Sequence, residues 1–326
     1  MATIWIERPI HPHGHAILAH HQVHCPAPEI GDPTADLSGV DAMIITGTTP
    51  INAAFVARAP NLRVVARPGI GIDTINLADC TAAGVLVTNT PDAPSESTAE
   101  HAVTLLMAVA RKLAQADQGM RTLGWQGRGG LQGIEMRDKT LALVGLGRIG
   151  GRVAHIMGQG MGMRVIAWDP FVGADRGAAL GVELRPSLDE ALAEADAVSL
   201  HVPLTVETRG LIGARELALM KPGCILVNCA RGPVVDEAAL YAALASGHLW
   251  GAGLDVFEVE PTPRENPLLS LENVIVTPHI ASFTEDGMYG MGVGAAEETL
   301  AALEGRQPRW LCNPAAWPGR GASLQR

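Results

Sequence analysis

The chain has 326 residues, 47% of them apolar, which is enough for about two domains with substantial cores. A formal net charge of −10 and the lack of basic runs argue against nucleic acid or an anionic membrane as a partner, and no apolar stretch reaches the length of a membrane span. Five cysteines without metal-ligand spacing, and an N-terminus without a signal-peptide pattern, lead us to expect a cytoplasmic protein.

Short apolar runs alternate with helical stretches in the first part of the chain. The runs predicted to be buried strands are 3–6, 42–45, 63–66 and 85–87. A turn cluster at 91–95 then precedes a long helix predicted over 98–121, with Ser95 or Ser97 as its cap. The apolar stripe of this helix comprises Ala102, Leu105, Leu106, Val109 and Leu113. The glycine-rich segment 124–130 is predicted to be a loop.

The glycines of Gly145-Leu-Gly147-Arg-Ile-Gly150 follow the apolar run 140–144 and precede a helix predicted over 152–159. We expect Gly145 to make a tight turn, Gly147 to let the backbone approach a pyrophosphate, and Gly150 to let the helix pack closely against the strand. Backbone N–H groups at the start of the helix, aided by the helix dipole, then face the phosphates. The motif therefore predicts a dinucleotide site.

Asp169 directly follows the next apolar run, 163–168. Dinucleotide-binding units carry an acidic residue at this position. Its carboxylate can accept hydrogen bonds from both hydroxyls of an adenosine ribose, and it would repel a 2′-phosphate. NAD is therefore the expected cofactor rather than NADP. Arg176 lies close enough in the sequence to leave the strictness of this preference open.

The alternation of strands and helices continues after Asp169. The predicted strands are 197–201, 224–228, 250–254 and 273–277, and a second long helix is predicted over 284–304. This pattern predicts the α/β class, with two Rossmann-like or flavodoxin-like, doubly wound parallel-sheet domains separated by a cleft. We expect residues 1–97 and 285–326 to form a discontinuous substrate domain and residues 98–284 to form the NAD-binding domain. The substrate would bind in the cleft, which would close about hinges near Ser97 and Ser282.

Arg231, Glu260 and His279 each follow a predicted parallel strand, at the edge where ligands of open α/β sheets bind. Hydride transfer to a carbonyl carbon leaves charge on the oxygen, so a proton donor is needed, and a histidine side chain is suited to this role, which makes His279 the candidate. Glu260 would orient the imidazole, and the planar fork of Arg231 would hold a substrate carboxylate and polarise the carbonyl. Asp255, at a strand tip, would accept from the nicotinamide carboxamide. Singly, each residue also has a structural explanation; their combination indicates a redox site.

Four blocks in one order carry a resemblance to the D-2-hydroxyacid dehydrogenase family, over a match from about Ala42 to Ser282. They are Arg67-Pro-Gly-Ile-Gly-Ile-Asp73, Ser97-Thr-Ala-Glu100 with the glycine motif, Asn228-Cys-Ala-Arg231-Gly, and Asp255-Val-Phe-x-x-Glu260-Pro with Thr277-Pro-His279. The resemblance implies Arg231, Glu260 and His279 as catalytic residues. It implies substrate binding by Gly69, Ile70 and Gly71, where glycines flanking Ile70 also form a plausible anion nest. The implied cofactor contacts are Gly145, Gly147, Arg148, Ile149, Gly150, Asp169, Val202, Cys229, Ala230 and Asp255.

The resemblance implies reduction of a small 2-oxo acid, such as glyoxylate, hydroxypyruvate or pyruvate, to the D-2-hydroxy acid, in a homodimer formed through the helix after Ser97. Where several relatives have Asn-Ser, this chain has Pro94-Ser95-Glu96, and Glu96 adds negative charge that disfavours a phosphorylated substrate. Because the sequence ends at Arg326, we expect no regulatory domain of the kind that some phosphoglycerate dehydrogenases carry. Two alternatives remain: a D-3-phosphoglycerate dehydrogenase, and an NAD(H)-sensing protein like the corepressors that share this fold.

Histidines gather near the N-terminus at positions 11, 13, 15, 20, 21 and 24. They indicate either a metal site or a polar loop and helix face. Few carboxylates or cysteines accompany them and hydride transfer needs no metal, so we expect no metal. Trp125 either covers an active site, by analogy with the family, or packs in an interface.

Overall fold

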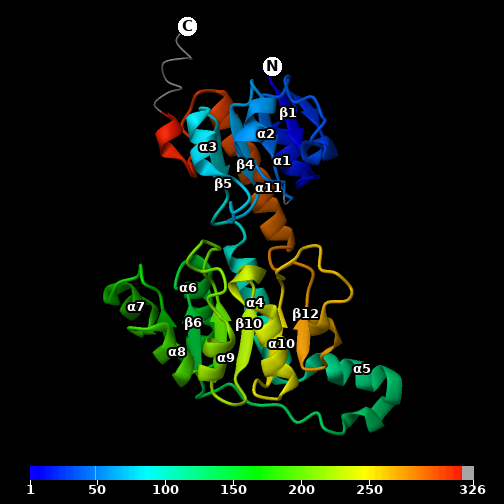
Figure 1. Cartoon of the computed structure of the whole chain (residues 1–326), viewed down its shortest axis with the longest axis vertical. Helices are drawn as coiled ribbons and strands as arrows, with labels where there is room; N and C mark the ends of the chain where they lie inside the picture. The colour runs from blue at the N-terminus through cyan, green and yellow to red at the C-terminus, as the bar shows by residue number, and fades with distance from the viewer. Residues whose placement is uncertain (48, 318–326) are drawn as a thin grey trace. The chain divides into compact units, whose positions relative to one another are not determined.

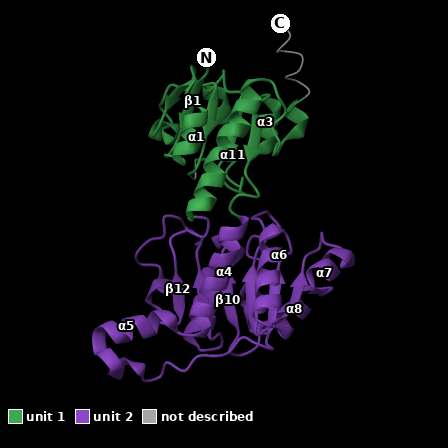
Figure 2. Cartoon of the chain, turned by 180° about the vertical axis from the view of Figure 1, so that it is seen from behind, with its two compact units in different colours: residues 1–94, 283–326 green, residues 95–282 purple. Residues whose placement is uncertain are grey.

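The computed structural model describes residues 1–47 and 49–317. The chain divides into two compact units, residues 1–94 with 283–326 and residues 95–282 (Figure 2). The structure divides the chain after residues 94 and 282, a few residues before the boundaries expected after residues 97 and 284. No helix among the described residues is long and apolar enough to cross a membrane. The two units are described separately.

The first unit is built on a five-stranded parallel sheet in the order β2-β1-β3-β4-β5. Its strands are β1 (Thr3–Ile6), β2 (Gln22–His24), β3 (Ala42–Ile44), β4 (Val64–Arg67) and β5 (Leu86–Asn89). This is the strand order of flavodoxin-like folds. The sequence analysis missed β2 because this three-residue edge strand has one apolar side chain between two exposed polar ones, which gives no hydrophobic run.

Helices cover both faces of this sheet, as a parallel sheet requires. They are α1 (Pro12–Ile17), α2 (Ala53–Arg58), α3 (Leu77–Ala82) and α11 (Glu285–Leu303). Phe55 of α2 and Cys80 of α3 belong to the core on one face, whereas Ala295 and Ala296 of α11 belong to the core on the other. The second long helix thus forms close to its predicted bounds.

The second unit is built on a seven-stranded parallel sheet in the order β12-β11-β10-β9-β6-β7-β8. Its strands are β6 (Thr140–Val144), β7 (Arg164–Trp168), β8 (Glu183–Leu184), β9 (Ala197–Leu200), β10 (Ile225–Asn228), β11 (Gly251–Leu254) and β12 (Val274–Val276). Counted from β6, the first six follow the doubly wound order of dinucleotide-binding folds, and β12 extends the sheet at one edge. The strand order changes direction between β6 and β9, which makes that point a ligand-binding crevice.

Two groups of helices sandwich this sheet (Figure 1). The helices of this unit are α4 (Ser95–Ala110), α5 (Leu113–Leu123), α6 (Arg148–His155), α7 (Ala174–Leu180), α8 (Leu188–Glu194), α9 (Ala214–Leu219) and α10 (Glu237–Ala245), of which α5 lies outside the two groups. Apolar residues of α4 and α6 join the core on one face, and those of α8, α9 and α10 join the core on the other. The central strands β6, β9, β10 and β11 are buried throughout, which explains their apolar runs in the sequence, whereas the edge strands β8 and β12 are partly exposed.

The single helix predicted over 98–121 is wrong. The structure has two helices there, α4 and α5, and the chain bends between them at Lys112, whose φ is +50°. No glycine or proline marks this break, so the sequence pattern could not reveal it. Leu113, which was predicted to belong to the buried apolar stripe of this helix, is 59% exposed. It lies in α5, which extends away from the sheet beside β12 (Figure 1).

Candidate active site

The turn between β6 and α6 has the geometry predicted for the glycine motif. Gly145 has a φ of +96°, and a Cβ there would lie 2.9 Å from the carbonyl of His201. A Cβ on Gly150 would clash with the carbonyl oxygen of Gly145. The tight turn and the close helix packing are therefore confirmed. A Cβ on Gly147 would meet no atom within 4 Å, so the space outside the turn is open to a ligand. The helix begins at Arg148, earlier than expected, so that Gly150 lies in its first turn.

Asp169 follows β7 and is hydrogen bonded to the glycine turn. Its Oδ2 accepts from the N–H of Leu146 at 2.8 Å, and its Oδ1 accepts from the N–H of Phe171 at 2.9 Å. The guanidinium of Arg176 lies 3.5 Å from where a Cβ on Gly151 of α6 would be. An open turn, a helix N-terminus and an acid on the adjacent strand fit a dinucleotide. The guanidinium of Arg176, next to α6, could attract a 2′-phosphate, so the expected preference for NAD over NADP stays a prediction.

The other predicted cofactor contacts lie along the same edge of the sheet. Val202 comes two residues after β9, and Cys229 and Ala230 directly follow β10; both of the latter are buried. Between β9 and Val202 lies His201, which the sequence analysis did not single out. Its Nε2 lies 2.9 Å from the Oγ of Ser199, and burial lowers the pKa of His201 to about 4.

Glu260 and His279 are hydrogen bonded, with Oε2 of Glu260 2.7 Å from Nδ1 of His279. The Oε1 of Glu260 accepts from the N–H of Phe257 at 3.0 Å. Burial raises the pKa of Glu260, but the hydrogen bond and charge of His279, the Phe257 N–H and the charge of Arg231 outweigh it, so the pKa is below its ordinary value. Glu260 is therefore an ionised acceptor, and His279 carries its proton on Nδ1 towards it. The His279 side chain is 46% exposed, which leaves its other ring nitrogen available for chemistry.

Arg231 follows β10 on a loop that packs against the loop bearing Glu260. A Cβ on Gly232 would clash with the backbone of Phe257, so only glycine allows these two loops to approach so closely. The Nη1 of Arg231 donates to the carbonyl of Ala230 at 2.7 Å. The structure of this unit thus brings the charge of Arg231 close enough to Glu260 to affect its pKa.

Asp255 is fully buried at the end of β11, and it holds the turn that carries His279. Its Oδ1 accepts from the Oγ1 of Thr277 at 2.6 Å and from the N–H of Ile280 at 2.8 Å; its Oδ2 accepts from the N–H of Ala281 at 2.9 Å. Contact between Asp255 and a nicotinamide stays a prediction. The observed role of this carboxylate is to hold the Thr277 side chain before His279 and the backbone N–H groups of the two residues after it.

The predicted substrate loop, Gly69 to Gly71, follows β4 in the first unit. The carbonyl of Gly69 accepts from the N–H of Thr90 at 2.9 Å, and the carbonyl of Ile70 accepts from the side-chain amide of Asn89 at 2.8 Å. Both peptide bonds are trans, so each N–H points opposite to the carbonyl it is joined to. The N–H groups of Ile70 and Gly71 therefore point away from β5, as an anion nest requires.

Two other features of the sequence have structural explanations. The Nε of Arg152 donates to Glu96 at 2.8 Å, so the negative charge expected from Glu96 is offset by an ion pair. Near the N-terminus, the ring of His11 stacks on that of His13, and the Nε2 of His11 lies 3.2 Å from Glu285. Within the described ranges, no group of three or more His, Cys, Asp or Glu side chains is placed to hold a metal.

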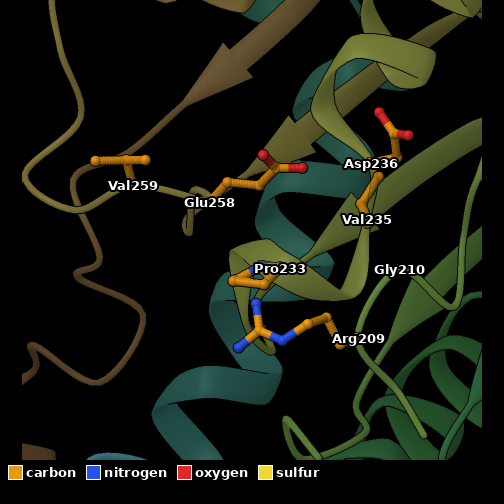
Figure 3. Close-up of a pocket in the computed structure, with 7 residues that line it drawn as sticks. All are labelled: Arg209, Gly210, Pro233, Val235, Asp236, Glu258 and Val259. Atoms are coloured by element: carbon orange, nitrogen blue, oxygen red, sulfur yellow. The ribbon is translucent and has the colours of Figure 1, made fainter. Parts of the chain in front are cut away.

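The second unit also has a surface pocket whose lining does not include Arg231, Glu260 or His279 (Figure 3). It has a volume of about 320 Å³ and is lined by Arg209, Gly210, Pro233, Val235, Asp236, Glu258 and Val259. The residues that line this pocket give no reason to prefer it to the Glu260–His279 pair as the active site, because they include no histidine and their carboxylates are solvated or bonded to backbone. The N–H of Glu237, for example, donates to Glu258 at 2.9 Å.

Comparison with known proteins agrees with this geometry. Residues 103–281 match the family model of the D-isomer specific 2-hydroxyacid dehydrogenase, NAD binding domain. The chain is 44% identical over 276 residues to a glyoxylate reductase of Korarchaeum cryptofilum, covering 84% of this chain and 82% of the relative. It is 42% identical over 273 residues to a D-3-phosphoglycerate dehydrogenase of Archaeoglobus fulgidus, covering 84% of this chain and 51% of the relative. The chain thus spans about half the length of the curated phosphoglycerate dehydrogenases it matches.

Solved structures give the same result. A glyoxylate/hydroxypyruvate reductase from Sinorhizobium meliloti, in complex with NADP and malonate, aligns with a TM-score of 0.86 and 31% identity over 97% of this chain and 98% of that chain. A D-lactate dehydrogenase from Aquifex aeolicus, complexed with NAD and lactic acid, aligns with a TM-score of 0.83 and 29% identity over 97% and 98%. From its fold, its glycine turn and these matches, the chain belongs to the D-isomer specific 2-hydroxyacid dehydrogenase family.

Proposed function

We propose that the chain is an NAD-dependent dehydrogenase that interconverts a small 2-oxo acid, of the glyoxylate, hydroxypyruvate or pyruvate type, and the corresponding D-2-hydroxy acid. The observation that carries the proposal is the 2.7 Å contact between Glu260 and Nδ1 of His279, with the imidazole half exposed at the same sheet edge as the glycine turn. If Glu260 were only a solvated loop acid and His279 only a core histidine, this hydrogen bond between them would not be expected. An ionised carboxylate behind an accessible imidazole is the arrangement that general acid–base catalysis needs.

His279 is the proposed acid and base. Glu260 favours the charged imidazolium, so that Nε2–H of His279 gives its proton to the carbonyl oxygen of the 2-oxo acid during reduction. In the opposite direction the neutral ring takes the hydroxyl proton back on Nε2. The hydride to C2 would come from NADH held at the glycine turn. The negative charge of Glu260 stabilises His279 while the proton is in place, and its bond to Nδ1 keeps the ring oriented.

Arg231 and the Gly69–Gly71 loop are the proposed substrate ligands. The guanidinium of Arg231 has planar donors that can hold a carboxylate and polarise the adjacent carbonyl. The N–H groups of Ile70 and Gly71, turned away from β5, supply further donors for the same carboxylate. A 2-oxo acid carries the carboxylate and the ketone side by side, which matches this donor set.

The glycine turn and Asp169 are the proposed cofactor ligands. The first-turn N–H groups of α6, including those of Arg148 and Ile149, would hold the pyrophosphate in the open space at Gly147. Asp169 would accept from the ribose hydroxyls, and Val202, Cys229, Ala230 and Asp255 would line the remainder of the site. We propose NAD as the preferred cofactor because a 2′-phosphate would meet the Asp169 carboxylate.

The substrate is tested by following the loss of NADH absorbance with glyoxylate, hydroxypyruvate, pyruvate, phenylpyruvate and 3-phosphohydroxypyruvate, and then repeating the series with NADPH. We expect turnover with at least one of the small unphosphorylated acids and more efficient use of NADH. A phosphorylated substrate is the second candidate, for two reasons. Several relatives are named D-3-phosphoglycerate dehydrogenase, and the ion pair with Arg152 offsets the charge of Glu96 that would repel a phosphate. Selective turnover of 3-phosphohydroxypyruvate would favour that candidate, whereas NADH binding without any turnover would favour the NAD(H)-sensing protein.

A further inference from the structure

α4 carries a histidine that reaches the turn bearing His279. The Nε2 of His101 lies 3.0 Å from the Oγ1 of Thr277 and 3.5 Å from Oδ1 of Asp255, and the His101 side chain is 19% exposed. Thr277 follows β12 and Asp255 follows β11, so three elements of the second unit meet at this point. His101 lies one turn before Leu105 of the buried face of α4, and the catalytic scheme above does not use it.

The directions of these hydrogen bonds follow from the chemistry of the groups. Burial raises the pKa of Asp255, but hydrogen bonds from His101, Thr277, Ile280 and Ala281 outweigh it, so the pKa lies below its ordinary value and the carboxylate is ionised. An ionised carboxylate only accepts, so the hydroxyl proton of Thr277 points to Asp255. The Thr277 oxygen then accepts from His101, whose Nε2 must carry a proton. His101, Thr277 and Asp255 thus form a directed chain of hydrogen bonds.

The turn at the end of this chain needs external support. His279 has a φ of +54°, a left-handed conformation that favours glycine and that a side chain makes strained. The N–H of His279 donates to the carbonyl of Asp255 at 2.8 Å, and the next two N–H groups donate to the carboxylate of the same residue. Asp255 therefore determines the direction in which the His279 imidazole leaves the backbone.

We propose that His101 is a positioning residue for the reaction: its Nε2–H, acting through the Thr277 hydroxyl, fixes the carboxylate of Asp255, which holds the strained turn that aims Nε2 of His279 at the substrate. This inference rests on the proposed function. Removing the His101 donor leaves the Thr277 hydroxyl and the Asp255 carboxylate with one fewer fixed partner. The turn then samples other orientations, and fewer of them place the imidazole correctly. The charged groups that face His279 from the neighbouring loops are Glu260 and Arg231, and both remain in the variants described next.

Two matched pairs of variants test this chain of hydrogen bonds. His101→Leu removes the donor, whereas His101→Gln keeps an N–H group at a similar reach. Thr277→Val removes the hydroxyl, whereas Thr277→Ser keeps it. We expect His101→Leu and Thr277→Val to lower kcat about tenfold, the factor that corresponds to one net hydrogen bond of ordinary strength, with an unchanged Kd for NADH. His101→Gln and Thr277→Ser should retain kcat to within about twofold.

A second measurement does not depend on turnover. The ring resonances of His279, assigned through a His279→Gln variant, are followed by NMR against pH in isotope-labelled protein. We expect their titration to change in His101→Leu and to match the parent protein in His101→Gln. Such a change in a protein that turns over no substrate would support the positioning role while rejecting the proposed function.

The proposal is overturned if His101→Leu keeps the parent kcat and the parent titration of His279. It is also overturned if His101→Gln is as impaired as His101→Leu, or if the loss appears only in NADH binding, because His101 would then act through packing or the cofactor. If His101→Leu fails to fold, the two Thr277 variants decide by the same criteria.

Discussion

The Oε2 of Glu260 lies 2.7 Å from Nδ1 of His279, while the other oxygen of Glu260 accepts the N–H of Phe257. The carboxylate is thus fixed from one side by backbone and presents its charge to the imidazole from the other. In the proposed reaction, this contact decides both the orientation of His279 and the stability of its protonated form. The most direct tests of the proposed function therefore concern these two residues.

Glu260→Gln should preserve the contact with Nδ1 while removing the charge. The imidazolium then loses its partner carboxylate, so the pH above which reduction declines should move to lower values. We expect kcat for reduction at pH 8 to fall by about tenfold and to recover partly at pH 6. The measurement is kcat against pH for both proteins, at saturating substrate and NADH. Identical profiles would show that Glu260 does not support the charged form of His279.

His279→Gln should lower kcat by about 10²–10⁴, because a positioned proton donor contributes a factor of that size. The Kd for NADH, measured by fluorescence titration, should stay close to that of the parent protein, since the glycine turn and Asp169 are untouched. Normal turnover in this variant would remove His279 from the mechanism. His248→Gln serves as the control and should keep full activity, because His248 precedes β11 whereas the candidate site lies after the ends of the strands.

Asp169→Ser should narrow the preference for NADH over NADPH, because the charge that would repel a 2′-phosphate is lost while a short polar side chain remains near the N–H groups of Leu146 and Phe171. We expect the ratio of the two kcat/KM values to change by at least about tenfold. A thermal unfolding curve for the variant separates this effect from damage to the glycine turn. An unchanged ratio would assign the preference to other residues.

Burial of His201 should make stability depend on pH. The folded pKa of about 4 lies below the value of about 6.5 for an unfolded chain, so below pH 6.5 the unfolded state binds a proton that the folded state excludes. The free energy of unfolding should therefore fall as the pH decreases from about 6.5 to about 4, by about 3 kcal/mol from this group. Urea unfolding at several pH values should show a smaller decline for His201→Gln. His20→Gln, at an exposed site, should leave the decline intact.

α5 should form the surface of a homodimer. Within this fully described helix no residue is buried, and Met120 and Leu123 are 58% and 66% exposed, with Trp125 beyond the helix at 75%. Exposed apolar side chains in such a group are typical of an interface. Leu123→Glu should shift the mass measured by light scattering from dimer to monomer. Val206→Glu, a change at a residue that is 90% exposed in another part of the unit, should not. A monomeric parent protein would refute the homodimer.

Local patterns were sufficient to predict most strands and the conformation of the glycine turn. A buried parallel strand needs an apolar run, and a tight turn packed against a helix needs glycine. The strand Thr140–Val144 and the turn from Gly145 to Gly150 could therefore be predicted from their own residues. The positions of Arg231, Glu260 and His279 after such runs likewise placed them at one sheet edge. These features depend on neighbours in the chain, which a sequence displays directly.

The tertiary structure alone decided the features that depend on distant partners. No local signal marks the bend at Lys112, where the chain leaves the core, or makes a strand of Gln22–His24, which exists because it pairs with β1. The engagement of Asp255 with the His279 turn, and the approach of His101 from α4, join residues that lie far apart in the sequence. Hydrogen bonds of this kind form only after packing has brought their donors and acceptors together, so the sequence specifies them through the whole fold rather than through any segment.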